Sequence, residues 1–261
     1  MTYAEVNGVS LWYEEHGDGE PLVLLHGGFW TIELFGGFLT ALAERRRVIA
    51  VELQGHGHTA DVDRPLRYET MGDDIAALIR HLGLGRTDVL GYSLGAGTAL
   101  RTTIQHPDAV RRLIVVSTPV RRTGWFPEVL AGMAQIGPES AEVMRASPLY
   151  AGYERVAPRV EDWPVLATKM GDLLRRDYDW SAEAARITAP TMLVYADADS
   201  IPPSHMAEFY ALLGGGLRDA DWDGSKRGLN RLAILPGHTH YDITTAPALP
   251  DLIEEFLSTS S

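Results

Sequence analysis

Hydrophobic and polar positions follow two alternating patterns along this chain. Short apolar runs end at Gly, Asp or Pro, and longer stretches with apolar residues three and four positions apart separate them. The short runs indicate buried parallel strands and the longer stretches indicate covering helices, because a parallel sheet is buried on both faces. The predicted buried strands are residues 22–25, 47–51, 88–91, 113–116, 192–195 and 232–235.

The start of the chain has a different pattern. Residues 4–6 and 9–13 flank Asn7-Gly8, the pair that a two-residue type I′ turn prefers. We therefore expect an antiparallel hairpin at the edge of the sheet.

Two of the longer stretches have clear helical signals. Residues 68–82 place an apolar residue on one face at each turn and end at Gly83. The members of that face are Met71, Ile75, Leu78, Ile79 and Leu82. Residues 96–106 form the second predicted helix, which Pro107 ends.

The middle of the chain, residues 119–185, breaks this alternation. It contains prolines between helical pieces and no convincing buried strand. The predicted fold is therefore α/β, with a mostly parallel central sheet formed by residues 1–118 and 186–261 and a helical cap inserted at residues 119–185.

A candidate nucleophile lies between a predicted strand and a predicted helix. Gly91-Tyr92-Ser93-Leu94-Gly95 matches G-x-S-x-G, in which small flanking residues permit a sharp turn that exposes the serine hydroxyl. A helix that begins at this turn directs its free amides toward developing negative charge. Ser93 is therefore predicted to be a nucleophile.

A serine nucleophile needs a histidine base and a carboxylate that orients it. Asp197 and Asp199 both follow the strand at residues 192–195, on the edge where Ser93 is expected, and Asp199 is the favoured acid. The loop after the last predicted strand offers two bases, His238 and His240.

Together these motifs resemble the α/β-hydrolase superfamily over nearly the whole chain. The other motifs that carry the resemblance are His26-Gly27-Gly28 and the run from Glu52 to His58. The resemblance implies that His240 is the base and that Leu94 supplies one backbone amide of an oxyanion hole. It implies that Gly28, or as second choice Phe29, supplies the other amide.

Such a triad implies a serine hydrolase that cleaves a carboxylic ester, or a lactone, through an acyl-enzyme on Ser93. Carbon–carbon bond hydrolases and cofactor-free perhydrolases use the same triad, and some superfamily members are non-catalytic small-molecule receptors. Epoxide hydrolases and haloalkane dehalogenases are disfavoured because their nucleophile at this turn is Asp.

Large side chains near the nucleophile and in the cap are candidates for a substrate pocket. The expected substrate contacts are Tyr92, Trp125, Phe126, Met133 and Trp163. Their apolar character favours a small to medium apolar acyl or alcohol group.

The composition narrows the classes of partner and cofactor. With 23 Lys and Arg against 35 Asp and Glu, the net charge is −12, which disfavours nucleic acid and anionic membranes. The chain has no Cys, no phosphate-binding glycine motif and no acidic ligands at recognisable spacing near His56 and His58, so we expect neither cofactor nor metal. Without a signal-peptide pattern, we expect a cytoplasmic monomer or homodimer.

Overall fold

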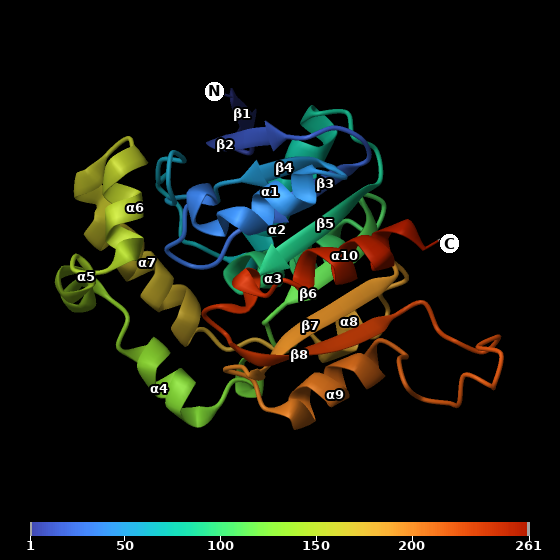
Figure 1. The fold of residues 1–261 in the computed structure, drawn as a ribbon. Coiled ribbons are helices and arrows are strands. Elements are labelled where there is room, and N and C mark those ends of the chain that lie inside the picture. The colour runs from blue at the N-terminus through green and yellow to red at the C-terminus, as the bar shows by residue number, and fades with distance from the viewer. Residues whose placement is uncertain (1, 260–261) are drawn as a thin grey trace.

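A computed structural model describes residues 2–259 of the chain. These residues form a single eight-stranded sheet with helices on both of its faces (Figure 1). The strand order is β1-β2-β4-β3-β5-β6-β7-β8, and all neighbours are parallel except the β1/β2 and β2/β4 pairs. The strands are β1 Thr2–Val6, β2 Val9–His16, β3 Pro21–Leu25, β4 Arg47–Val51, β5 Thr87–Tyr92, β6 Val110–Val116, β7 Thr191–Ala198 and β8 Arg231–Thr239. The predicted α/β fold class is confirmed.

The first hairpin forms at the predicted turn. Asn7 and Gly8 have φ values of 48° and 80°, so both central residues are left-handed, as a type I′ turn requires. Val6 pairs with Val9 across the turn, and β2 continues along β4.

Alternate residues of each central strand serve two separate cores. Val23 and Leu25 pack on the side of α2 and α3, whereas Leu22 and Leu24 pack on the side of α1 and α10. This alternation follows from the two-residue period of a strand and gives β3 its continuous apolar sequence.

The two covering helices that the sequence predicts, α2 and α3, begin or end close to the predicted positions. Gly83 follows α2 with φ of 64°, the conformation that commonly ends a helix. The covering helices are α1 Gly37–Ala43, α2 Tyr68–His81, α3 Leu94–Gln105, α8 Ser181–Ala184, α9 Pro203–Leu212 and α10 Leu249–Ser258, with 3₁₀ turns η1 Ile32–Phe35 and η4 Ile243–Thr245. Helix α3 starts two residues before the prediction, directly after Ser93.

The chain between β6 and α8 forms a group of helices beside the sheet (Figure 1). They are α4 Pro127–Ala134, α5 Pro138–Met144, α6 Pro148–Val156 and α7 Trp163–Arg175, with 3₁₀ turns η2 Arg122–Gly124 and η3 Val160–Asp162. Each of α4, α5, α6 and α7 has a proline in its first two positions, where a missing amide proton costs no helical hydrogen bond. We refer to α4–α7 as the cap helices; the division of the chain into core and cap remains a prediction.

One strand is less buried than predicted. Residues 232–235 were expected to be buried, but within β8 only Leu235 is, and Ile234 is 44% exposed. The reason is position: β8 is the edge of the sheet and pairs only with β7, so its apolar sequence faces partly into solvent.

Candidate active site

Ser93 lies at a strained turn between β5 and α3. Its φ of 53° and ψ of −111° are outside the conformations that side-chain-bearing residues usually adopt. A Cβ added to Gly91 would lie 2.2 Å from the Gly95 carbonyl oxygen, and one added to Gly95 would lie 2.3 Å from the Leu25 carbonyl oxygen. Both glycines are therefore required for α3 to approach the strands so closely.

Three side chains from separate parts of the chain form a continuous hydrogen-bonded series. His240 Nε2 lies 3.1 Å from Ser93 Oγ, and His240 Nδ1 lies 3.1 Å from Asp199 Oδ1. The structure thus brings together the three residues predicted to be nucleophile, base and acid. In this arrangement Nδ1 donates to the carboxylate, which leaves Nε2 free to accept the serine proton.

The Asp199 carboxylate is buried and well supplied with donors. Its Oδ2 accepts hydrogen bonds from Ser117 Oγ at 2.6 Å and from the Ala196 amide at 3.1 Å, and the Ser200 amide donates to Oδ1. Burial alone would raise the pKa of Asp199, but the hydrogen bonds from His240, Ser117 and Ala196 outweigh it and hold that pKa below its usual range. The carboxylate is therefore ionised at neutral pH.

Two aromatic residues fix the position of His240. Tyr92, next to the nucleophile, donates its hydroxyl proton to the His240 carbonyl oxygen at 2.6 Å. The Trp125 ring stands edge-on to the imidazole, with ring centroids 5.5 Å apart. These contacts restrict both the backbone and the ring of His240.

The alternative acid and base lie elsewhere. Asp197 is exposed and accepts a hydrogen bond from the Gly237 amide, so it braces the β7–β8 edge rather than the histidine. His238 lies 3.9 Å from Asp242, and its Nδ1 has no hydrogen-bond partner among the described residues. Neither side chain joins the series that includes Ser93.

The residues predicted to stabilise an oxyanion line the same cavity as Ser93. Leu94 is the first residue of α3, where an amide has no partner within the helix. A Cβ added to Gly28 would lie 4.0 Å from Leu94 Cβ, so the two backbones are neighbours. Phe29 follows Gly28 with φ of 62°, and Gly28, Phe29 and Leu94 all line the cavity that contains Ser93.

Comparison with known proteins identifies the family. Residues 20–218 match the family model described as the alpha/beta hydrolase fold. The chain belongs to this alpha/beta hydrolase family. It is 28% identical to the pimeloyl-[acyl-carrier protein] methyl ester esterase of Nitrosomonas europaea over 220 residues, which are 77% of this chain and 85% of that protein.

Other alpha/beta hydrolases are similar over different lengths. A Haemophilus influenzae protein named provisionally as an esterase or lipase is 33% identical over 95 residues, and the matched part is 36% of this chain and only 33% of that protein. The structure of an esterase from Thermogutta terrifontis superposes with a TM-score of 0.73 at 22% identity, over 98% of this chain and 96% of that one. The structural likeness shows the fold alone.

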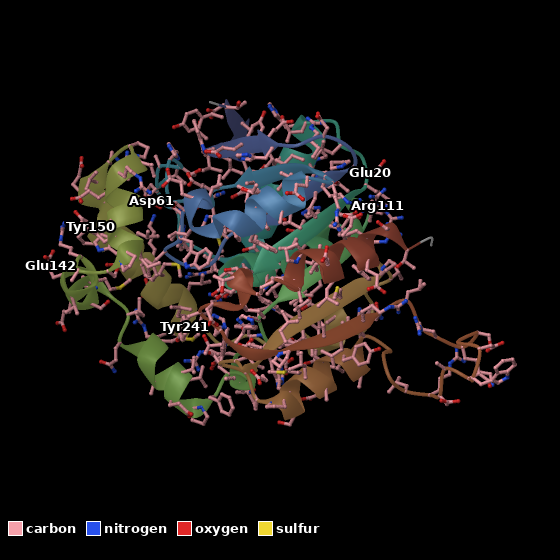
Figure 2. The ribbon with its side chains drawn as sticks, viewed as in Figure 1. Glu20, Asp61, Arg111, Glu142, Tyr150 and Tyr241 are labelled. Carbon is pink, nitrogen blue, oxygen red and sulfur yellow. The ribbon has the colours of Figure 1, made fainter. Side chains whose placement is uncertain are left out.

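Ser93 opens into a cavity of about 460 Å³ between the sheet and the cap helices of this alpha/beta hydrolase. Of the predicted substrate contacts, Tyr92, Trp125 and Met133 line this cavity. Figure 2 shows Tyr241, another lining residue, on the side of the sheet that faces the cap helices. A cavity of this size accommodates a small to medium organic substrate.

Two predicted substrate contacts do not reach the cavity. Trp163 is fully buried among Phe29, Tyr150 and Tyr153, and its Nε1 donates to the Ala141 carbonyl, so it forms the centre of the cap helices. Phe126 is half-buried directly before α4, outside the cavity lining.

Several cavity residues were not predicted as substrate contacts. They include Trp30, Tyr68, Val129, Ile136, Met144, Leu149, Met170 and Leu174. Their helical spacing in the cap, such as 129–133–136 and 170–174, was visible in the sequence. That spacing alone does not tell which helical face meets the cavity and which meets the cap interior.

The histidine-containing loops of this alpha/beta hydrolase support the site without facing the serine. His26 Nε2 accepts from the Leu53 amide and His56 Nδ1 bonds the Gln54 carbonyl, while the Glu52 carboxylate accepts from the Ile32 and His58 amides. Among residues 2–259, no group of three His, Cys, Asp or Glu side chains is arranged to hold a metal ion. Nor does any helix in that range have the length and apolar content needed to cross a membrane.

Proposed function

We propose that this alpha/beta hydrolase cleaves carboxylic esters, lactones included, through an acyl-enzyme on Ser93. The observation that carries the proposal is the hydrogen-bonded series Ser93–His240–Asp199 at the wall of a mostly apolar cavity. Relatives that are named as esterases support the choice of an ester bond.

The first half-reaction begins when Ser93 Oγ attacks the ester carbonyl carbon. His240 Nε2 takes the hydroxyl proton, and the ionised Asp199 stabilises the imidazolium that forms. The carbonyl oxygen becomes an oxyanion, which accepts hydrogen bonds from the amides of Leu94 and of Gly28 or Phe29. His240 then gives its proton to the departing alcohol, and Ser93 keeps the acyl group.

The second half-reaction uses water as the nucleophile. His240 removes a proton from water, hydroxide attacks the acyl carbonyl, and the same amides stabilise the second oxyanion. The carboxylic acid leaves when His240 returns its proton to Ser93 Oγ. The net reaction consumes one ester and one water and releases one alcohol and one acid.

Hydrolysis of p-nitrophenyl esters of rising acyl length tests this proposal, with matched pairs of variants. Ser93→Ala, His240→Ala and Asp199→Ala should each lower kcat by at least roughly 10³-fold, because members of a triad act as a unit. His238→Ala and Asp197→Ala change the same residue types within two positions, and they should stay within about threefold of the wild type.

Other outcomes would change the conclusion. Equal losses in the two control variants would contradict the assignment of base and acid. If the protein is inert toward esters but a fluorophosphonate labels Ser93, the serine is a reactive nucleophile and the bond that the enzyme cleaves is not an ester bond. If the protein neither hydrolyses esters nor reacts with the fluorophosphonate, the result would contradict a hydrolytic function and favour a receptor.

A further inference from the structure

Acidic and basic side chains are unevenly represented in the lining of the cavity beside Ser93. Among the described residues that line it, Glu128 has the only carboxylate, and none is Lys or Arg. Glu128 lies in the first turn of α4, is exposed, and makes no ion pair within residues 2–259. Its charge is therefore not neutralised by a cation within that range and can attract a cationic ligand.

Aromatic side chains form much of the rest of the cavity wall. Tyr92, Trp125 and Tyr241 line it, and their ring centroids lie 5.6, 5.5 and 5.2 Å from that of His240. The faces of aromatic rings attract cations and give nothing to an anion. A substrate carboxylate in this cavity would lose hydration and find no cationic partner.

The whole molecule, like the cavity, has an excess of negative charge. Its net charge of −12 produces a negative field that raises the local concentration of cationic ligands and lowers that of anionic ones. The cavity and the overall charge thus act in the same direction on an approaching substrate.

We propose that the substrate is an ester without an anionic group, and that Glu128 makes the enzyme prefer an ammonium-bearing ester to a carboxylate-bearing one. This inference rests on the proposed function and adds the charge class of the substrate to it. Glu128 determines specificity because it attracts the charged group on the alcohol part of the substrate. It takes no part in bond cleavage.

The test uses three butyryl esters of similar size whose alcohols differ in charge. They are the esters of choline, of 3,3-dimethylbutanol and of 3-hydroxypropanoate, and acid release in a pH-stat gives kcat/KM for each. The wild type should prefer the choline ester to the hydroxypropanoate ester by about tenfold or more at low ionic strength. Added salt should reduce that ratio, because salt screens exposed charges.

Variants at Glu128 separate the carboxylate from the rest of the cavity. Glu128→Gln should lower the cationic-to-anionic ratio roughly two- to fivefold, the size expected of an ion pair at an exposed site. Glu128→Lys should reverse the order of the two esters. Glu139→Gln, the same change in the first turn of α5, should leave the ratio unchanged.

The neutral ester tells the two proposals apart. If the wild type hydrolyses it but favours the anionic ester, or if Glu128→Gln leaves the ratio unchanged, the charge inference is overturned and the esterase proposal stands. If the wild type hydrolyses p-nitrophenyl butyrate but none of the three esters, the charge inference fails and the esterase proposal stands; if it hydrolyses none of the four, both proposals fail.

Discussion

At the scale of single residues, Ser117 is one of three described non-glycine residues near the active site with a left-handed backbone, together with Phe29 and Ser93. It follows β6 with φ of 54°, is fully buried, and donates its hydroxyl proton to Asp199 Oδ2 at 2.6 Å. Its amide donates to the Val194 carbonyl, which fixes the backbone in this left-handed conformation. Such a conformation costs about 1 kcal/mol or more. It places the Ser117 hydroxyl where it holds the Asp199 carboxylate.

Replacement of Ser117 tests whether it positions Asp199. Ser117→Ala and Ser117→Gly both remove the hydroxyl, so each should lower kcat roughly tenfold on an ester substrate while KM changes by less than about twofold. Glycine also relieves the left-handed backbone, so the glycine variant should unfold a few degrees above the alanine variant in a thermal melt. A kcat that follows the melting temperature would instead indicate a purely structural role.

At the scale of elements, α7 connects the cap helices to the active site and to the loop after β4. Met170 lines the cavity, and its Cε occupies the space where a Cβ on Gly28 would lie, 2.8 Å away. The preceding residue, Lys169, donates to Asp61 Oδ2 and to the carbonyls of Val62 and Arg64 at 2.6–2.8 Å. Figure 2 shows Asp61 on the side of the core that faces α6 and α7.

Loss of Lys169 should loosen α7. Lys169→Met leaves the largely buried Asp61 carboxylate without its cation, at a cost of roughly 1 to 3 kcal/mol. We expect faster amide hydrogen exchange in α7 and a lower kcat/KM for esters. Adding Asp61→Asn to Lys169→Met should recover part of the hydrogen-exchange protection of α7 and part of kcat/KM. The asparagine removes the unpaired charge, and its side-chain oxygen can still accept the hydrogen bond from Gln54. No recovery in the double variant would contradict this account.

At the scale of the whole molecule, two buried histidines link stability to pH. Burial, reinforced by the neighbouring His56, lowers the pKa of His26 to about 3, and burial lowers the pKa of His56 to about 4. In the unfolded chain both should titrate near 6.5. Below that pH the unfolded state binds more protons than the folded state, so stability is full above about 6.5 and is lost as pH falls toward 3 or 4.

Urea unfolding at several pH values measures this effect. Each histidine should reduce the free energy of unfolding by up to about 1.4 kcal/mol per pH unit between its two pKa values. His56→Asn should make the dependence on pH shallower between about 6 and 4. His81→Asn, which changes an exposed histidine, should leave the slope unchanged. Equal slopes in all three proteins would refute the assignment to His56.

Much of the fold was predictable because its signals are local. The type I′ turn at Asn7-Gly8, the apolar face of α2 and the turn at Ser93 each depend on residues within a few positions of one another. The main error, the burial of residues 232–235, arose because an apolar edge strand and an apolar central strand have similar sequences. Only the sheet order separates them.

The sequence by itself therefore determined the family, the order of the strands along the chain, two of the covering helices and the small set of residues from which the site is built. Tertiary structure decided which members of that set meet. A register shift in the β7/β8 pairing between Ala196 and Ala198 lies immediately before Asp199, which reaches His240, whereas Asp197 remains at the edge. Likewise Trp163 is enclosed by the cap helices while Met170 reaches the cavity, because distant packing partners, which no local pattern encodes, fix the rotation of α7.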